Sequence, residues 1–319
     1  MRLQQLRYFV AVAERRHFTK AAADLAVAQP SVSKQIGRLE AELGTPLFHR
    51  MRGNIALTPA GEVLLAWARR VLADVASAQT EVRALAGLGR GRLAVGATPS
   101  LTVTLLAPAL ARYRASYPGI ELALTEAGSR DLVRDLERGE LDIALVILPV
   151  EHDVLETMPL LREELVVAAP RGHPLAKREA LAVSDLRGVP LVMFRDGYDL
   201  RAATLAACRA AGFEATLAIE GGEMDGVLQL AAAGLGVAVV PSMVLRRGVD
   251  LRAVRLRPRL VRTVGFAHRR DRRLSRAAQA FVEVACALVR ERDFLRRMPR
   301  GIEVLEAAPI VADEPAGRT

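Results

Sequence analysis

The sequence predicts an α/β protein with three parts: a small helical head carrying a short β hairpin, one long helix, and a two-lobed α/β body. Three observations support this. Helical periodicity recurs through residues 3–43, a helical pattern without proline or glycine lies between Gly61 and Gly87, and strand and helix patterns alternate from Arg92 onward. Because 319 residues exceed one ordinary core, we expect several modules.

The composition is that of a folded protein. Apolar residues make up 51% and charged residues 25%, which excludes a mostly disordered chain. The first residues lack the apolar run of a signal peptide, and charges interrupt the apolar segments elsewhere before they reach membrane-spanning length. We therefore expect a cytoplasmic protein with no membrane partner.

The net charge of +9 is unevenly distributed. Residues 1–58 carry 9 basic and 4 acidic side chains, residues 92–245 carry 14 and 20, and residues 246–300 carry 17 and 5. A basic head suits a polyanionic partner such as DNA.

Three helices are expected in the head. The first buries a stripe made by Leu3, Leu6, Phe9, Val10 and Ala13. The second starts near Thr19, which is suited to an N-cap, and small alanines let another helix approach it. The third has Pro30 in its first turn and Gly44 at its end, and its buried stripe consists of Val32, Ile36, Leu39 and Leu43.

The opposite face of the third helix carries short polar residues first and basic residues later, which suits base-edge and phosphate contacts in a major groove. Residues 46–57 then predict two short strands around a turn, a wing that places arginines on phosphates. The candidate DNA contacts are Gln29, Pro30, Ser31, Ser33, Lys34, Arg38, Arg50 and Arg52. The alternative is a small helical bundle with ordinary surface charges.

The residues from Phe18 to Ile36, together with those from Leu39 to Arg50, resemble the LysR-type transcriptional regulators in order, spacing and composition. The resemblance implies a winged helix-turn-helix over residues 1–58 that binds double-stranded promoter or operator DNA, and it leaves RNA polymerase open as a further partner. One departure is Ala28, where the family commonly has serine. If that serine caps the helix, its loss costs about 1 kcal/mol.

A linker helix is expected over residues 59–86, with Thr58 as N-cap, Pro59 in the first turn and Glu62 beside it. Steps of four and three residues form a coiled-coil seam, made by Leu64, Ala68, Val71, Val75, Ala78, Val82 and Leu85. The alternative is that this stripe packs on its own domain. The family resemblance implies pairing through this helix, as a homodimer or homotetramer.

A hinge is expected at residues 87–91, because glycine occurs at every second position there. Strands and helices then alternate over residues 92–300, which predicts two α/β lobes. Lobe I takes about residues 92–162 and 266–295, lobe II takes about residues 163–265, and residues 301–319 are expected to be a disordered tail.

The body resembles the effector-binding domain of the same family, whose fold is similar to type 2 periplasmic solute-binding proteins. The segments that carry this resemblance are 139–144 and 233–237. It implies a small-molecule effector in a cleft lined by Ser100, Leu101, Thr102, Ser129, Ile147, Leu148, Tyr198 and Met224. The hydroxyls and helix start at residues 98–100 suit an anionic effector.

Catalytic, metal and cofactor motifs were not found, and no enzyme activity, cofactor or metal is expected. Cys208 and Cys286 are expected to be buried thiols rather than a redox pair. Glu163 and Glu164 are expected to face solvent. The arginines between residues 252 and 273 are expected to form a solvated rim, with contact to DNA or an acidic neighbouring subunit as the alternative.

Two other functions stay open. One is an effector-independent repressor. The other is a solute-binding or enzymatic α/β protein that acquired a DNA-binding head.

Overall fold

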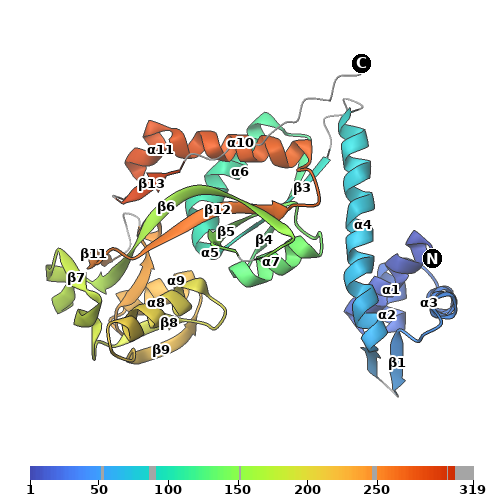
Figure 1. Cartoon of the computed structure of the whole chain (residues 1–319), viewed down its shortest axis with the longest axis horizontal. Coiled ribbons are helices and arrows are strands. Elements are labelled where there is room, and N and C mark those ends of the chain that lie inside the picture. The colour runs from blue at the N-terminus through green and yellow to red at the C-terminus, as the bar shows by residue number, and fades with distance from the viewer. Residues whose placement is uncertain (52–53, 86–90, 151, 246–249, 300, 306–319) are drawn as a thin grey trace. The chain divides into compact units, whose positions relative to one another are not determined.

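A computed structural model describes residues 1–51, 54–85, 91–150, 152–245, 250–299 and 301–305 (Figure 1). Its contacts divide the chain into two units. The first holds residues 1–88 with 137–140, and the second holds residues 89–136 with 141–319. We describe each separately and call them the head and the body. Among the described residues, no helix combines the length and apolar character needed to cross a bilayer.

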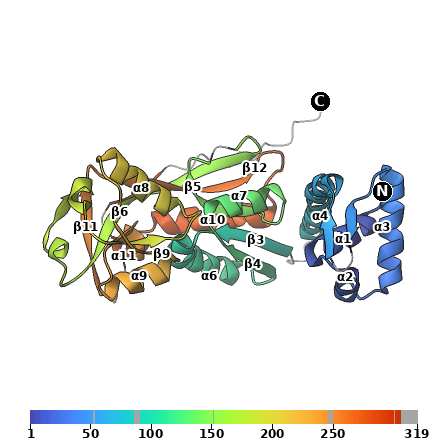
Figure 2. The ribbon, with the colours of Figure 1, turned by 90° about the horizontal axis from the view of Figure 1, so that it is seen from below.

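Three short helices form the head: α1 (Leu3–Arg15), α2 (Phe18–Asp24) and α3 (Gln29–Leu43) (Figure 2). A hairpin of β1 (Phe48–Met51) and β2 (Asn54–Leu57) follows and pairs in antiparallel register. The long helix α4 (Pro59–Leu85) completes the unit. The buried residues of α1, α3 and the hairpin make one core around Phe9, Ile36 and Phe48. This is the predicted winged helix-turn-helix.

Local sequence signals account for the start of α4 and the end of α3. Thr58 caps α4, because its Oγ1 accepts a hydrogen bond from Gly61 N at 3.0 Å. Gly44 ends α3 with a left-handed φ of 70°. The expected N-cap at Thr19 was wrong: α2 starts one residue earlier, and His17 Nδ1 accepts from Lys20 N. Leu3 and Leu43 lie 41% and 43% exposed, so both stripes are shorter than expected.

Lobe I of the body contains five main strands in the order β4 (Ile120–Glu126), β3 (Gly91–Ala97), β5 (Ile143–Leu148), β12 (Val261–Arg269) and the first half of β6 (Leu155–Pro170). On one side, α6 (Ala107–Ser116) and α10 (Arg276–Arg290) bury Tyr113 and Phe281. On the other side, α7 (Ser129–Glu137) buries Leu132 and Leu136. The predicted α/β lobe is therefore present, with helices on both faces of its sheet.

Lobe II is built around the second half of β6, which pairs with β10 (Ala238–Pro241) and β11 (Leu251–Arg257), and β11 pairs with the short β7 (Ala180–Ala182). A separate parallel pair joins β8 (Leu191–Phe194) to β9 (Leu217–Gly222). Two helices, α8 (Asp199–Ala210) and α9 (Met224–Ala232), pack in the same core. The predicted two-lobed α/β body is confirmed.

One long strand connects the two lobes. β6 pairs with β12 through residues 155–164 and with β10 and β11 through residues 165–170. The expected lobe limit at residues 162 and 163 thus falls inside a strand, because a hydrophobic alternation does not reveal that a strand changes partners. β12 belongs to the lobe I sheet from Val261 onward, so the expected limit at 265 lies within that strand as well.

The expected hinge and tail need correction where they are described. Residues 86–90 lie outside the described residues, and Gly91 opens β3 rather than belonging to a linker. In the expected tail, Ile302–Val304 forms strand β13, which pairs with β6 and continues with a hydrogen bond from Leu305 N to Leu160 O at 2.9 Å. A short helix α11 (Arg292–Arg297) precedes it. Residues 306–319 lie outside the described part of the chain.

Candidate functional site

The helix α3 has two contrasting faces. Val32, Ile36 and Leu39 are fully buried in the head core. Four of the predicted DNA contacts on the same helix are exposed: Pro30, Ser31, Lys34 and Arg38. Gln29 and Ser33 are half-buried beside them. The burial of one apolar stripe therefore leaves a polar and basic surface that begins at the N-terminal end of the helix.

The wing holds the remaining predicted DNA contacts. Arg50 lies on β1, opposite Ile55 of β2. Arg52 falls outside the described residues, and the structure does not describe the side chain of Arg50. The hairpin expected at this place is present, and its tip is the part that is not described.

The start of α3 lacks a side-chain cap. Ala28 occupies the N-cap position with extended backbone angles of φ −71° and ψ 136°, and it has no oxygen to accept a bond from the first turn. The backbone closes the turn instead, because Ser31 N donates to Ala28 O at 3.0 Å. This is the weakness that the sequence indicated at position 28.

The predicted coiled-coil seam divides into two halves on α4. Its first residues serve the head: Ala68 is 1% exposed, and Leu64 and Val71 pack against the same core. Its later residues are free of that core, with Val75 half-buried, and Ala78 and Val82 exposed. The structure does not describe the side chain of Leu85. A neighbouring stripe also exposes Val63 and Trp67, at 64% and 57%.

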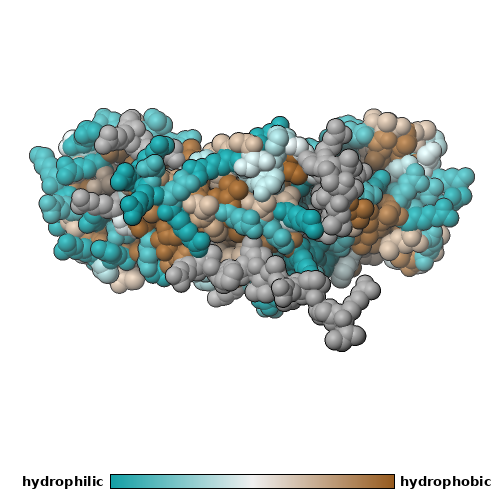
Figure 3. All heavy atoms as spheres, turned by 90° about the horizontal axis from the view of Figure 1, so that it is seen from above, coloured by the Kyte–Doolittle hydropathy of each residue, from teal (hydrophilic) through white to brown (hydrophobic). Residues whose placement is uncertain are grey.

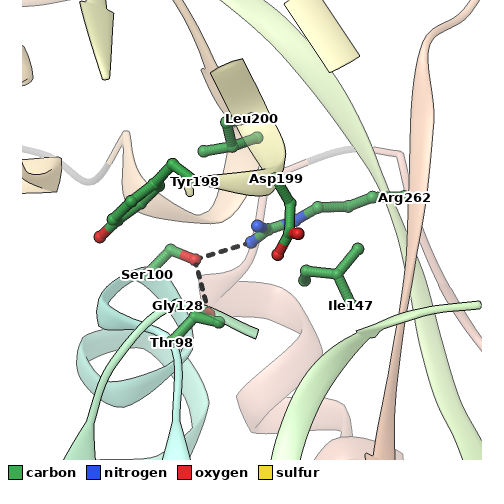
Figure 4. Close-up of a pocket in the computed structure, with 8 residues that line it drawn as sticks. All are labelled: Thr98, Ser100, Gly128, Ile147, Tyr198, Asp199, Leu200 and Arg262. Atoms are coloured by element: carbon green, nitrogen blue, oxygen red, sulfur yellow. Dashed lines mark hydrogen bonds between the residues drawn. The ribbon is translucent and has the colours of Figure 1, made fainter. Parts of the chain in front are cut away.

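A pocket lies between the two lobes of the body, and we call it the interlobe pocket (Figure 4). Lobe I supplies four of the lining residues, and β12 supplies an arginine. The start of α8 in lobe II supplies the other three. The lining residues are Thr98, Ser100, Gly128, Ile147, Tyr198, Asp199, Leu200 and Arg262. About 10 Å³ is open to the centres of water-sized molecules, so the pocket is nearly filled by its own side chains.

Three of the eight predicted effector contacts line the interlobe pocket: Ser100, Ile147 and Tyr198. Ser129 lies beside it and donates its hydroxyl to Asp199 Oδ2 at 2.5 Å, which ties α7 of lobe I to α8 of lobe II. The other four do not line the pocket: Leu101, Thr102, Leu148 and Met224.

Each of those four side chains packs in a core or bonds within its own helix. Leu101 and Met224 are core residues of lobes I and II. Leu148 packs partly buried among the residues beneath α7. Thr102 Oγ1 donates to Thr98 O at 3.2 Å within its own helix. The family resemblance indicated positions at the ends of helices and strands, but it did not give the direction of each side chain.

Arg262 is the pocket residue that the sequence interpretation placed elsewhere. It was expected in a solvated rim, yet it is 8% exposed. Its Nη2 donates to Ser100 Oγ at 2.9 Å and lies 2.6 Å from Glu163 Oε1, and its Nε donates to the same oxygen at 2.8 Å. Figure 4 shows the guanidinium reaching into the pocket from β12.

Glu163 and Glu164 are buried, so the expectation that they face solvent was wrong. Glu163 is fully buried and also accepts a bond from Met243 N at 3.3 Å. Glu164 is paired with Arg259 at 3.2 Å. The two carboxylates lie where β6 passes from one lobe to the other, and there cations on neighbouring segments offset their burial.

Tyr198 forms the lobe II wall of the pocket. Its ring stacks on Phe194 with centroids 5.1 Å apart, and its hydroxyl donates to Glu223 Oε2 at 2.9 Å. Arg195 lies over the same ring at 5.4 Å and also contacts Glu223. Burial, with the bond to Glu223 as a further cause, raises the pKa of Tyr198 well above its usual 10.0. The side chain is therefore a neutral, firmly held wall.

Comparison with known proteins identifies both units. Residues 3–62 match the family described as "Bacterial regulatory helix-turn-helix protein, lysR family". Residues 86–288 match the family described as "LysR substrate binding domain". The chain belongs to the LysR family of transcriptional regulators.

Individual relatives cover nearly the whole of this LysR-type regulator. It is 32% identical over 287 residues to the transcriptional dual regulator GltC of Bacillus subtilis, covering 89% of this chain and 96% of that one. A solved full-length OxyR from Pseudomonas aeruginosa, with a cysteine-to-aspartate substitution, matches at a TM-score of 0.70 and 29% identity, covering 94% and 98%. Full-length CbnR complexed with its target DNA matches at 0.66 and 27%, covering 89% and 99%.

The two cysteines of this LysR-type regulator lie in different cores. Cys208 is buried in lobe II, and Cys286 is partly buried against the lobe I core. Both are free thiols, and burial raises the pKa of each above the usual 9.0. Thiols held in the protonated form are poor nucleophiles, which fits the expected bystander role. Among the described residues, no cluster of three His, Cys, Asp or Glu side chains could hold a metal ion.

The arginine-rich segment of this regulator is only partly a surface feature. On β11, Arg252, Arg255 and Arg257 are exposed while Val254 and Leu256 are buried, which agrees with the alternation in the sequence. Arg269, however, is 5% exposed and pairs with Asp271. Hydrophilic residues cover much of the body face in Figure 3, with hydrophobic ones interspersed.

Proposed function

We propose that this LysR-type regulator binds operator DNA sequence-specifically through α3 and the wing, and that a small molecule in the interlobe pocket controls this binding. The exposed polar face of α3 carries the proposal. Ser31 stands at the helix start, where base edges are read, while Lys34 and Arg38 lie further along, where phosphates pass. A DNA partner also implies a cytoplasmic location. The functional division is residues 1–58, 59–86 and 92–300.

A mobility-shift assay on the DNA upstream of the regulator's own gene tests the DNA contacts. Lys34→Ala should weaken binding and make the plot of log affinity against log salt shallower by about 0.9, because one phosphate contact is lost. Lys177→Ala removes an exposed lysine from the body and is the matched control. Equal affinity and equal salt dependence for wild type and Lys34→Ala would contradict the assignment.

Effector control is supported by the position of the interlobe pocket. Residues from both lobes line it, and Ser129 of lobe I bonds directly to Asp199 of lobe II. A molecule that binds one arrangement of the lobes better than another shifts the equilibrium between them. Thermal-shift screening of the full chain, followed by mobility shifts with any stabilising compound, tests this. A compound that stabilises the protein without changing DNA affinity would count against effector control.

Pairing through α4 is the third part of the proposal. Val63, Trp67 and Val82 are exposed apolar side chains on a helix of 27 residues, and water contact with them is unfavourable. A second copy of the chain, as a homodimer or within a homotetramer, is the proposed partner. Two copies would place two α3 helices on one pseudo-palindromic site.

An effector-independent repressor is a second candidate, favoured by one observation. The interlobe pocket is nearly filled by the chain's own side chains, and Arg262 is one of them. Under that function, no compound that enters the pocket would change DNA affinity, and Ser100→Ala would leave binding to the operator unaltered. A ligand-dependent change in the mobility shift would exclude this candidate.

A further inference from the structure

The charges of the interlobe pocket indicate which chemical class it accepts, an inference that rests on the proposed effector site. Arg262 is the cation among its lining residues, and Glu163 neutralises it through contacts at 2.6 and 2.8 Å. Because Glu163 is fully buried, water could not solvate its carboxylate if Arg262 turned to a ligand. The ion pair therefore presents no net charge to a ligand in the pocket.

Asp199 supplies a second carboxylate on the pocket wall. Its Oδ2 accepts the hydroxyl of Ser129 at 2.5 Å, and within the described parts of the chain no cation lies within the 4.0 Å of an ion pair. Figure 4 shows Asp199 among the residues that line the pocket. Among the lining residues Arg262 counts as +1 and Asp199 as −1, and Glu163 behind Arg262 adds a further −1, so these three groups together carry a net charge of −1 before any ligand enters.

This balance disfavours the anionic effector expected from the hydroxyls near residue 98. A ligand carboxylate on Arg262 would compete with Glu163 and would add a third negative charge to the two of Glu163 and Asp199. A cation beside Asp199 would instead make the site neutral. A ligand oxygen can also still find a donor, because no described residue accepts a hydrogen bond from Arg262 Nη1.

We propose that the interlobe pocket binds a small protonated amine that carries a hydrogen-bond acceptor. The ammonium group contacts Asp199, the acceptor receives a bond from Arg262 Nη1, and the carbon atoms lie against Ile147, Leu200 and the ring of Tyr198. The ammonium competes with Ser129 for the carboxylate of Asp199. The pocket is nearly filled in the arrangement described above, so the ligand binds an arrangement in which the two lobes have moved apart. Because the Ser129–Asp199 hydrogen bond joins the lobes, binding changes how they are held together.

Three small compounds of similar size test the charge preference on the full chain: ethanolamine is the amine with an acceptor, glycolate the anion with the same hydroxyl, and glycine the zwitterion. At matched ionic strength and a tenfold excess over its Kd, ethanolamine should raise the unfolding midpoint by about 3 °C. Glycolate should not raise it, and glycine should raise it less than ethanolamine because its carboxylate adds a negative charge to the site. Stabilisation by glycolate but not ethanolamine, or by none of the three, would overturn the proposal.

Substitutions locate the effect. Asp199→Asn should abolish the shift with ethanolamine, and Asp225→Asn, which removes an exposed carboxylate of the same lobe, should keep it. Ser129→Ala frees the carboxylate of Asp199 without altering its charge and should lower the ethanolamine Kd several-fold, a result that does not depend on Asp199→Asn folding normally. Unchanged ethanolamine binding in both Asp199→Asn and Ser129→Ala would contradict the site.

The same preparations separate this proposal from the proposed function. A mobility shift that depends on Lys34, together with stabilisation by glycolate alone, overturns the amine preference and leaves DNA-binding regulation intact. DNA binding that is insensitive to Lys34→Ala, together with stabilisation by ethanolamine that requires Asp199, leaves the ligand class intact and contradicts the DNA contacts.

Discussion

Arg262 and Glu163 lie opposite each other on neighbouring antiparallel strands, and their side chains meet at 2.6 Å where β6 passes from lobe I to lobe II. The pair also positions Arg262 against Ser100, which lies in the short helical segment after β3. One buried ion pair therefore connects the crossover strands to the wall of the interlobe pocket.

Removing one partner of this pair should be costly. We expect Arg262→Ala to lower the free energy of unfolding by about 3–5 kcal/mol, because Glu163 would keep a buried charge without a partner. Urea unfolding measures this. Arg171→Ala breaks an ion pair whose two side chains are about three-quarters exposed and should cost under about 1 kcal/mol. The double variant Arg262→Met with Glu163→Leu should lose less unfolding free energy than the sum of the losses in Arg262→Met and in Glu163→Leu. Full additivity would contradict the pairing.

A cap should strengthen the start of α3. Ala28→Ser places a hydroxyl where the backbone already has the extended N-cap conformation, so we expect a gain of about 1 kcal/mol in unfolding free energy. Ala23→Ser is the control, because it puts the same change inside α2, where serine is a poorer helix former than alanine. Thermal unfolding of the two variants, compared with wild type, distinguishes these effects. A loss of stability in Ala28→Ser would show that the end is held in another way.

The exposed side of α4 should govern association. Val82→Glu places a charge on an apolar position that is 66% exposed, so it should weaken pairing at least tenfold while leaving the fold of the single chain unchanged. Gln79→Ala, at an exposed polar position of the same helix, serves as control. Sedimentation velocity over a concentration series measures the association constant. Equal association of Val82→Glu and wild type would move the interface away from this end of α4.

Glycine is required at one position by a close backbone approach. A Cβ on residue 236 would lie 2.3 Å from Pro190 O, so Gly236→Ala must displace β8 or the segment that enters β10, and we expect a loss of about 1–3 kcal/mol. Gly226 is also in lobe II, but its added Cβ meets nothing within 4 Å and it lies inside α9. Gly226→Ala should therefore stabilise by about 0.5–1 kcal/mol. Opposite signs in denaturant unfolding confirm the distinction.

The thiols should resist alkylation in the folded protein. Burial raises the pKa of Cys208 and Cys286 above 9.0, so the reactive thiolate forms only at higher pH than in the unfolded chain. Because the folded state holds these protons more tightly, the associated stability is present below the unfolded pKa and decreases as pH rises through the folded one. Iodoacetamide labelling followed by mass spectrometry should be slow at pH 8 and accelerate above pH 9. Rapid labelling at pH 7 would indicate an exposed thiolate.

Patterns with a strong local cause were predictable from the sequence. The stripe of Val32, Ile36 and Leu39 follows from helical periodicity, and the capping by Thr58 and the end of α3 at Gly44 follow from side-chain and backbone preferences. The remaining face of α3 is polar because most large apolar residues of this helix lie in the buried stripe. Ala28 was identified through the resemblance to the family, which commonly has serine there, and the structure places it at the N-cap without a side-chain bond.

Features that depend on distant partners could not be predicted in this way. Arg262 and Glu163 looked like solvated charges because each lies among other charged residues, and only the pairing of β12 with β6 brings them together across 99 positions. The apolar seam of α4 is periodic along its whole length. Ala68 nevertheless packs in the head core, while Val82 is exposed. Periodicity states that a face is apolar but does not say what covers it.

The sequence alone determined the winged head, the long helix and the two-lobed α/β body, because each depends on residue spacings of a few positions that the backbone geometry converts directly into a fold. The tertiary structure decided which side chains share the interlobe pocket and what charge it carries. Those properties arise from Asp199, Glu163 and Arg262, which are brought together by strands that cross between lobes. The energy of a buried charge depends on its neighbours in space, and those neighbours are not its neighbours in the chain.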